Sequence, residues 1–394
     1  MKKIFFTLGA VVAMIAATSC GSGVVKSGPT EILLSADQLT EIYSRYSDIE
    51  DEFHEGACVV YQGDNNAGLV NLKCQEILPC EYNEIEYVGE GYFIVKKGES
   101  YLTREEGVVD CNGKIAIPCE YYDGEYYGDG LFRFATSNSY PYNEGLLSAK
   151  VEEGATATFK EIAPFTHKEI EYLGEGLFKF EELEDKKHCV RYGIMNSLGE
   201  ILAPGETYSE VDSFHEGLAA IRTLNPNNKA EWHWDEIYGY INNKCEIVLP
   251  LAYDFADKFV DGVAIVELND TYNMIDTTGK TIVSFGKNSK PTSLYYLVDG
   301  VIPVLFYDEE KGTFHTDFYN AKGEKAISET FLYAMYNDLF DKFEVLRQDQ
   351  SAVYINGKGE VMDLQFDEDD RDLLIKLLHN DLPYGFKDAY GLFE

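Results

Sequence analysis

Basic residues are scarce in this chain. Lys and Arg together number 33 against 69 Asp and Glu, which gives a formal net charge of −36. Binding to nucleic acid requires a basic surface that displaces counterions from the phosphates, and adhesion to anionic lipid headgroups also requires basic residues. The composition therefore excludes nucleic acid as the expected partner. Trp is rare too, with 2 residues in 394.

Long hydrophobic runs are missing as well. A membrane-spanning helix needs about 18 or more apolar residues, and the most apolar segment, residues 4–17, is too short. The chain is nevertheless 45% hydrophobic, which excludes a disordered protein. Tyr (29), Phe (23) and Gly (34) are abundant, and these residues favour strands and turns. The composition therefore indicates an all-β protein.

The first twenty residues have the pattern of an export signal. A positive segment (residues 1–3) precedes the apolar segment, and Ala17-Thr18-Ser19 places small residues before Cys20. This pattern resembles a bacterial lipoprotein signal, which implies removal of residues 1–19 and lipidation of Cys20. The alternative is an ordinary secretory signal.

A lipid on Cys20 would anchor the protein to the bacterial cell envelope. Residues 21–30 are small and polar, and residues 20–34 are expected to form a tether. Residues 21–30 contain no acidic residue, which favours an outer-membrane anchor that faces the periplasm.

One short motif recurs along the rest of the chain. An acidic residue, a Gly and a hydrophobic strand follow one another at seven places, and an eighth copy without the Gly lies at Phe340–Val345. The anchor glycines are Gly56, Gly91, Gly130, Gly176, Gly217, Gly262 and Gly300. Their spacings are 35, 39, 46, 41, 45 and 38 residues. The body of the protein is therefore an array of about eight units of about 40 residues.

A second motif between the anchors predicts a β-hairpin. It consists of a strand, a polar turn rich in Asn, Asp and Gly, and a second strand, as in Tyr192–Ile201 and Tyr238–Ile247. The second strand often reaches a Pro, as at Pro79, Pro118 and Pro250. Because Pro cannot donate to a strand ladder, we expect it to mark the strand end.

The two motifs together resemble the WG repeat, a bacterial β-repeat. Tyr192-Gly193 and Tyr238-Gly239 stand where the family has Trp-Gly. The resemblance covers residues 50–363, and it implies a repeat architecture without a particular activity.

Such units cannot bury both faces of their own sheet, so neighbouring units must cover them. We expect a propeller-like array, with an open β-solenoid as the alternative. Short helices are expected to cover its two ends. The first lies in residues 35–49, where Ser35 and Gln38 have the spacing of a capping box. The second lies within residues 364–394, over Asp367–His379.

The sequence offers no recognisable catalytic set, cofactor motif or metal-ligand spacing. His54 and His215 occupy the same slot of two units and are expected to be structural. The chain has 8 Cys, and lipidation of Cys20 would leave an odd number. Cys80 and Cys119 also share a slot, and either a disulfide between them or two free thiols is compatible with it.

The candidate ligand-binding residues are Trp232, His233 and Trp234, in an insertion that holds both Trp residues of the chain. Trp provides flat area for stacking on sugars, aromatic ligands or cations; packing on a neighbouring unit is the alternative. The leading functional hypothesis is a non-catalytic, lipid-anchored envelope protein that serves as a scaffold for a protein or glycan partner. The alternatives are carbohydrate binding through Trp232 and Trp234, and an envelope hydrolase with an unrecognised carboxylate site.

Overall fold

The computed structural model describes residues 35–381, apart from 51, 64, 101–102, 140–141, 151–157, 183–190, 226–235, 293–294, 309 and 363–367. Over these residues the chain forms 28 strands and two helices. All strand pairs are antiparallel and join strands that are consecutive in the sequence. Among the described helices, neither is long and apolar enough to cross a membrane. The all-β prediction is confirmed.

Eight repeat units, of four strands in units one to six and three strands in units seven and eight, account for the strands, which matches the predicted number of copies. The first unit is a sheet in the order β1-β2-β3-β4. Its strands are β1 (Asp48–Ile49), β2 (Ala57–Tyr61), β3 (Ala67–Asn71) and β4 (Glu76–Tyr82). The later units repeat this order of strands.

Units two to four share one ten-stranded sheet. Their strands are β5 (Glu84–Gly89), β6 (Tyr92–Lys97), β7 (Glu105–Asp110), β8 (Ile115–Tyr126), β9 (Leu131–Ala135), β10 (Glu144–Ser148), β11 (Lys160–Gly174), β12 (Leu177–Glu182), β13 (Tyr192–Asn196) and β14 (Ile201–Tyr208). The long strands β8 and β11 each close one unit and open the next, since each pairs with a strand of both units.

Units five to eight form separate sheets. Unit five contains β15 (Glu210–Val211), β16 (Leu218–Leu224), β17 (Glu236–Asn242) and β18 (Ile247–Tyr253). Unit six contains β19 (Phe255–Ala256), β20 (Val263–Glu267), β21 (Tyr272–Asp276) and β22 (Thr281–Gly286). Unit seven contains β23 (Ser289–Pro291), β24 (Val301–Asp308) and β25 (Thr313–Asn320), and unit eight contains β26 (Tyr333–Asn337), β27 (Lys342–Leu346) and β28 (Ala352–Ile355). Isolated bridges of Lys325 and Val361 stand in place of a fourth strand in these last two units.

The anchor motif forms the tight turn between the first two strands of each unit. In the first seven units the acidic residue and the anchor Gly both have positive φ, for example 56° at Glu216 and 77° at Gly217. Two successive residues with positive φ give the turn whose twist matches that of antiparallel strands. In the eighth unit Asp341 keeps this conformation, with φ 52°, although Lys342 replaces the Gly. The eroded eighth copy is therefore confirmed.

The prediction that Pro ends its strand is wrong. Pro250 lies inside β18, where the pairing with β17 shifts between Leu249 and Tyr253. The extra residues on β18 form a bulge, which is a position that tolerates a missing N–H donor. The bulge presses on the opposite strand, because a Cβ on Gly239 would lie 2.9 Å from the Leu249 carbonyl oxygen. This contact explains why the motif has Gly after the aromatic residue.

The hydrophobic core lies between successive units. One cluster joins Leu173 and Ile194 of unit four to Val211 and Ile241 of unit five. Further clusters join unit five to unit six and unit seven to unit eight. As predicted, the units bury one another's faces, because a single four-stranded sheet cannot cover both of its own.

Hydrogen bonds at the anchor turns add to these contacts. The Gly217 N–H donates to Glu175 Oε1 of the preceding unit at 2.8 Å, and the Gly262 N–H donates to Glu216 Oε2 at 2.9 Å. The acidic residue of one turn thus holds the next turn. Charge-assisted bonds of this kind fix the spacing between units.

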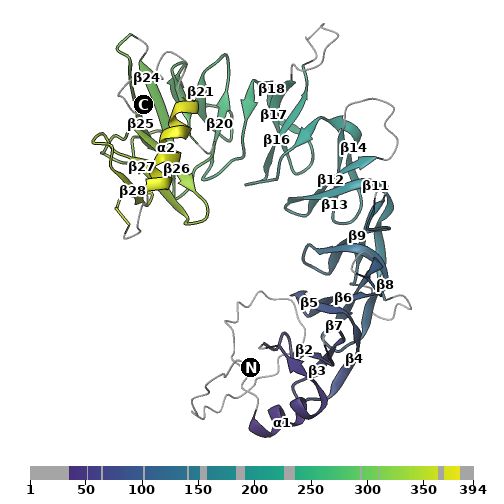
Figure 1. Cartoon of the computed structure of the whole chain (residues 1–394). Helices are drawn as coiled ribbons and strands as arrows, with labels where there is room; N and C mark the ends of the chain where they lie inside the picture. Colours follow the sequence, from purple (N-terminus) through teal and green to yellow (C-terminus); the bar gives the residue numbers. More distant parts are fainter. Residues whose placement is uncertain are drawn as a thin grey trace.

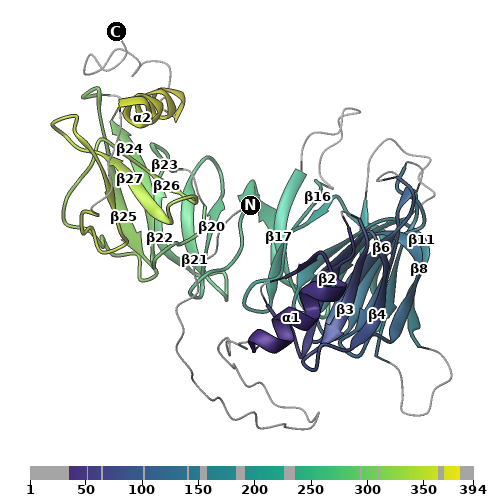
Figure 2. The ribbon, with the colours of Figure 1, turned by 60° about the horizontal axis from the view of Figure 1, so that its bottom comes forward.

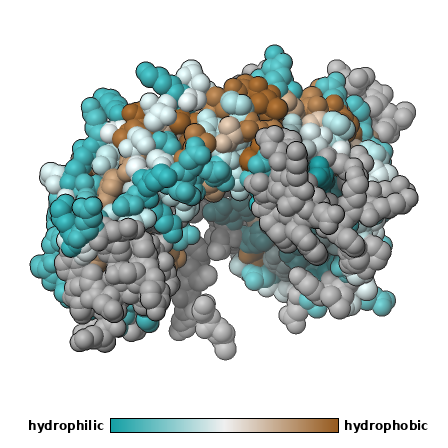
Figure 3. Space-filling model, turned by 90° about the horizontal axis from the view of Figure 1, so that it is seen from above, coloured by the Kyte–Doolittle hydropathy of each residue, from teal (hydrophilic) through white to brown (hydrophobic). Residues whose placement is uncertain are grey.

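The sheets follow one another along an open arc, with the N-terminal and C-terminal units at its two ends (Figure 1). The second view also separates β26 and β27 from β2, β3 and β4 (Figure 2). The array therefore does not close into a ring. Viewed from above, hydrophobic residues gather along the middle of the arc with hydrophilic residues around them (Figure 3).

Both end helices are present. In α1 (Ala36–Arg45) the capping box is formed, since the Gln38 N–H donates to Ser35 Oγ and the Ser35 N–H donates to Gln38 Oε1. Ile42 of α1 packs into a cluster of the first unit. In α2 (Glu368–Asp381) Leu374 and Leu378 are fully buried against units seven and eight. Each helix covers the apolar face that an end unit would otherwise expose.

Candidate functional site

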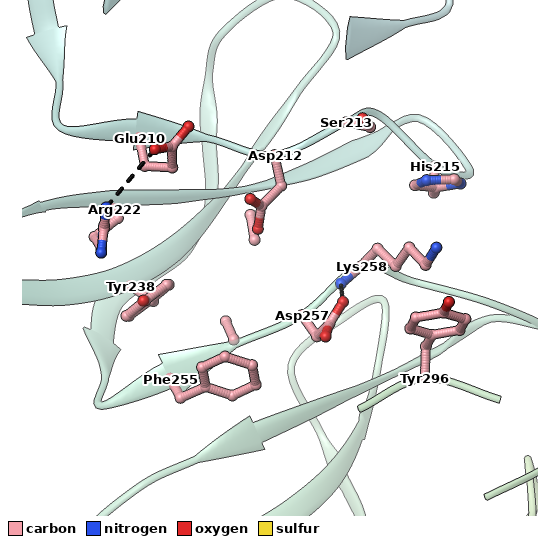
Figure 4. Close-up of a pocket in the computed structure, with 12 residues that line it drawn as sticks. Glu210, Asp212, Ser213, His215, Arg222, Tyr238, Phe255, Asp257, Lys258 and Tyr296 are labelled. Atoms are coloured by element: carbon pink, nitrogen blue, oxygen red, sulfur yellow. Dashed lines mark hydrogen bonds and ion pairs between the residues drawn. The ribbon is translucent and has the colours of Figure 1, made fainter. Parts of the chain in front are cut away.

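A cavity of about 550 Å³ opens between units five and six. Its walls come from β15, β16, β17 and β19, from the segments that lead into the two anchor turns, and from Tyr296 before β24 (Figure 4). Acidic, basic and aromatic side chains line it together. Concave sites with a few convergent polar groups are the usual places for ligands in proteins.

Two of the lining carboxylates occupy the same position of successive units. Asp212 and Asp257 each precede the anchor Gly of their unit by five residues. Their backbones are equivalent too, because the Asp212 N–H donates to the Ala220 carbonyl and the Asp257 N–H to the Ile265 carbonyl. Repetition of the unit therefore brings one carboxylate from each side into the same cavity.

The cavity raises the pKa of both carboxyl groups. Asp212 is an exposed residue, but partial desolvation by the cavity walls, followed by the charges of Asp257 and Glu210, raises the pKa of its carboxyl group to about 6. Burial also raises the pKa of Asp257, although the backbone N–H of Lys258 donates to its Oδ1 at 2.6 Å and opposes the shift. The pKa of His215 is lowered by burial and by Lys258, so this imidazole is neutral at pH 7.

The basic residues of the cavity have other partners. Arg222 forms ion pairs with Glu236 at 3.1 Å and with Glu210 at 3.7 Å. The Lys258 ammonium lies 3.7 Å from the centre of the Tyr296 ring. Within the described part of the chain, no ion pair involves Asp212 or Asp257.

Aromatic side chains complete the walls. The rings of Tyr238 and Phe255, from units five and six, lie 5.7 Å apart and are tilted by 54°. Next to the cavity, the hydroxyl of the buried Tyr240 donates to the carbonyl oxygen of the lining residue Asp257 at 2.6 Å. This bond fixes the backbone that carries Asp257.

A smaller cavity of about 320 Å³ lies between units two and three, and its charges are paired. Lys96 lies 3.3 Å from Glu84 and 4.0 Å from Glu106, and the Gly124 N–H also donates to Glu106. The described residues contain no group of three or more His, Cys, Asp or Glu that could hold a metal ion. The cavity between units five and six is therefore the stronger candidate site.

The sequence-predicted site residues cannot be compared with this cavity. Cys20, Trp232, His233 and Trp234 lie outside the described residues. The insertion that contains the two Trp residues joins β16 to β17, both of which line the cavity. Its role in binding stays a prediction.

The two histidines in equivalent slots have different surroundings. His54 stacks on Tyr87 of unit two, with ring centres 4.1 Å apart, whereas His215 lines the cavity. Cys80 and Cys119 are free thiols, so the possible disulfide between them is not formed. The sequence did not predict the cavity. An alignment of the units with one another would show which units carry the repeated carboxylate without a basic residue opposite it, and this is the signal that could have found the site.

Replacing Asp212 by Asn should stabilise the protein more at pH 7.5 than at pH 5.0. The pKa of Asp212 is higher in the folded protein, at about 6, than the ordinary value of 3.8. Ionisation therefore costs the folded state stability as the pH rises between these values, and the full cost is present above pH 6. Asn never ionises and avoids it. Urea unfolding at the two pH values measures the difference.

The matched control is Asp276→Asn. Asp276 is only half-buried and is the last residue of β21, before a turn. Its Oδ1 accepts the N–H of Thr278, and hydrogen bonding lowers the pKa of its carboxyl group. Asn fills the equivalent turn position at Asn242 and Asn320. This variant should therefore show no gain at pH 7.5, and an equal gain in both variants would contradict the assignment of the effect to the cavity.

Parts of this chain are similar to a known repeat family, and the chain aligns with several solved structures. A family model described as WG containing repeat matches residues 68–101, 107–140, 192–225 and 238–272. No curated protein matches the chain.

Three of the solved structures that match this chain share little sequence with it. A eukaryotic initiation factor aligns with 78% of this chain and 84% of its own, at 9% identity and a TM-score of 0.39. Oligopeptidase B from Trypanosoma brucei aligns with 72% of this chain and 49% of its own, at 12% identity and a TM-score of 0.30. A structure from a study of two prolyl endopeptidases aligns with 81% of this chain and 54% of its own, at 8% identity and a TM-score of 0.28. This chain thus spans about half the length of the two peptidases.

The matched segments fall on β3–β6, β7–β9, β13–β16 and β17–β21, and each runs from one unit into the next. They include both hairpins in which Tyr-Gly replaces Trp-Gly. Four segments of this all-β repeat protein thus match the model of the WG containing repeat.

Proposed function

We propose that this protein is a non-catalytic, lipid-anchored binding protein of the bacterial cell envelope, in which the repeat array is a scaffold for a protein or glycan partner. The observation that carries the proposal is the cavity between units five and six. It combines aromatic walls with two carboxylates that have no ion-pair partner among the described residues. Asp212 is exposed and Asp257 is half-buried, so both carboxylates remain accessible to a ligand. A concave site with convergent polar groups is where proteins usually bind ligands.

The anchor belongs to the same proposal. The small residues before Cys20 resemble a lipoprotein signal, and a tether over residues 20–34 would let the array stand away from the membrane. Lipidation of Cys20 holds the protein at the surface where an envelope partner is met.

The test is a crosslinking capture from envelope fractions with the full-length protein. We expect the wild type in the membrane fraction and Cys20→Ser in the soluble fraction. We also expect the wild type to capture one partner that the double variant Asp212→Asn/Asp257→Asn does not capture, because the wild-type carboxylates contact that partner. Asp276→Asn serves as the matched control. Capture that is the same in the double variant and the wild type would overturn the assignment of the site.

A second function is favoured by one observation. Two carboxyl groups of raised pKa in one cavity, Asp212 and Asp257, could act as an acid and base in glycan hydrolysis. Incubation of the purified protein with envelope glycans, followed by detection of new reducing ends, separates the two functions. Binding without turnover supports the scaffold; turnover that disappears in Asp212→Asn would establish the hydrolase instead.

A further inference from the structure

The repeat allows each unit to serve as a control for the others. The residue three positions after the anchor Gly is Arg133 in unit three and Lys179 in unit four. It lies directly across the strand pair from the residue five positions before the anchor, which is Glu125 in unit three and Glu171 in unit four. The same two positions lie opposite each other in units five and six. There the residue before the anchor is Asp212 in unit five and Asp257 in unit six.

In units three and four the carboxylate has a basic partner inside the array. Arg133 lies 3.0 Å from Glu125 and 2.8 Å from the buried Glu144. Lys179, whose side chain is 8% exposed, lies 2.9 Å from both Glu171 and Glu210, and Glu210 belongs to the next unit. One cation therefore neutralises the repeated carboxylate and reaches toward a second acidic residue.

In units five and six the basic residue is replaced by an apolar one. Ala220 lies opposite Asp212, and Ile265 lies opposite Asp257. Ala220 is also one of the residues that line the cavity of about 550 Å³. Units five and six therefore carry the repeated carboxylate without the internal cation, as unit two does at Glu86 and Ile94. In units five and six an open space lies beside these carboxylates.

The basic residues that remain in the cavity do not replace the lost cation. Arg222 is held by Glu236 and Glu210. The Lys258 side chain runs toward His215 and Tyr296 and away from the two carboxylates (Figure 4). Its ammonium lies over the Tyr296 ring, where a cation–π contact stabilises it.

We propose that this cavity binds the ammonium or guanidinium group of a ligand, which pairs with Asp212 and Asp257 as Lys179 and Arg133 pair with the equivalent carboxylates. The alkyl stem of such a group would pack on the Tyr238 and Phe255 rings. The ligand class is an alkylamine or alkylguanidine, either as a Lys or Arg side chain of a partner chain or as a free polyamine. The inference deepens the proposed function and rests on it.

The test uses three probes at pH 7.5, where Asp212 is ionised. A Gly-Lys-Gly peptide with blocked ends represents a side chain, cadaverine represents a free amine, and Gly-norleucine-Gly lacks only the charge. We expect calorimetry to detect at least one of the two cationic probes and no binding of the norleucine peptide. Tighter binding of the peptide than of cadaverine assigns the source to a partner chain, and the reverse assigns it to a polyamine.

Two variants test the carboxylates and the missing cation separately. Asp212→Asn/Asp257→Asn keeps the size of the cavity and should weaken the cationic probe at least about 10-fold, because charge-assisted pairing is lost. Ala220→Lys places in unit five the internal cation that unit four has at Lys179. This variant should abolish binding of the cationic probes. Asp276→Asn should bind as the wild type does.

The outcomes distinguish this inference from the proposed function. Equal binding of the norleucine and lysine peptides, or unchanged affinity in the Asn double variant, would overturn the cation site. If envelope capture still depends on Asp212 and Asp257 in that case, the binding function stands and the ligand has another chemistry. If capture does not depend on them either, both proposals fail.

Discussion

Replacing Gly113 by Ala should lower the free energy of unfolding by about 3 kcal/mol. Gly113 lies in the turn between β7 and β8 with φ +75°, a conformation that costs an L-residue about 1 kcal/mol or more. A Cβ at this position would also lie 2.0 Å from the carbonyl oxygen of Ile77 in β4 of the preceding unit. Because that atom belongs to a strand backbone, the two units must move apart. Urea unfolding followed by near-ultraviolet circular dichroism measures the loss.

Gly300→Ala is the matched control for this prediction. Gly300 has the same φ of +75°, but a Cβ there would have no heavy atom within 4 Å. Gly300→Ala should therefore lower the free energy of unfolding only by the cost of the left-handed backbone conformation, about 1 kcal/mol. Equal losses in the two variants would show that the turn of unit two does not press on unit one. A larger loss at Gly113 supports the close packing of successive units.

Replacing Lys179 by Ala should lower the free energy of unfolding by about 2 kcal/mol. The Lys179 side chain is 8% exposed and joins Glu171 of unit four to Glu210 of unit five. Burial lowers its pKa, but hydrogen bonds and charges of the two carboxylates raise it more, so the group is fully charged at neutral pH. Its loss leaves two carboxylates without their shared partner. Both are partly exposed, and for that reason the expected loss is smaller than for a fully buried pair.

The control for Lys179 is an exposed pair of the same type. The Lys97 side chain is 52% exposed and lies 3.1 Å from Glu81, which is 61% exposed. Lys97→Ala should change the free energy of unfolding by less than about 0.5 kcal/mol, because water solvates both charges. Similar changes in the two variants would contradict a bridging role for Lys179, and with it the comparison on which the cation site depends.

Much of the fold was predictable because its determinants are local. The acidic-Gly step at Glu216-Gly217 encodes two positive φ angles, which only a few residue types adopt easily. The capping box at Ser35 and Gln38 is equally local and is present as predicted. Even at Asp341, where the Gly is missing, the acidic residue keeps the turn conformation. Each of these features depends on residues only a few positions apart.

The role of Pro250 could not be predicted in the same way. The missing N–H is a local property, but whether the strand ends or forms a bulge depends on the partner strand. Gly239 has no side chain and leaves room for the bulge, so β18 continues to Tyr253. The union of units two to four in one ten-stranded sheet was also not predictable, since it depends on whether β8 and β11 run through from one unit to the next.

The sequence by itself determined that this protein is a β-repeat array with eight copies and helical ends, because turn conformations, strand alternation and helix caps are set by neighbouring residues. Only the tertiary structure decided that the array is an open arc and that a cavity lies between units five and six. Asp212 and Asp257 are 45 residues apart and become neighbours through the packing of two sheets. The curvature of the arc and the surroundings of these carboxylates both arise from the contacts between units, and no single unit contains them.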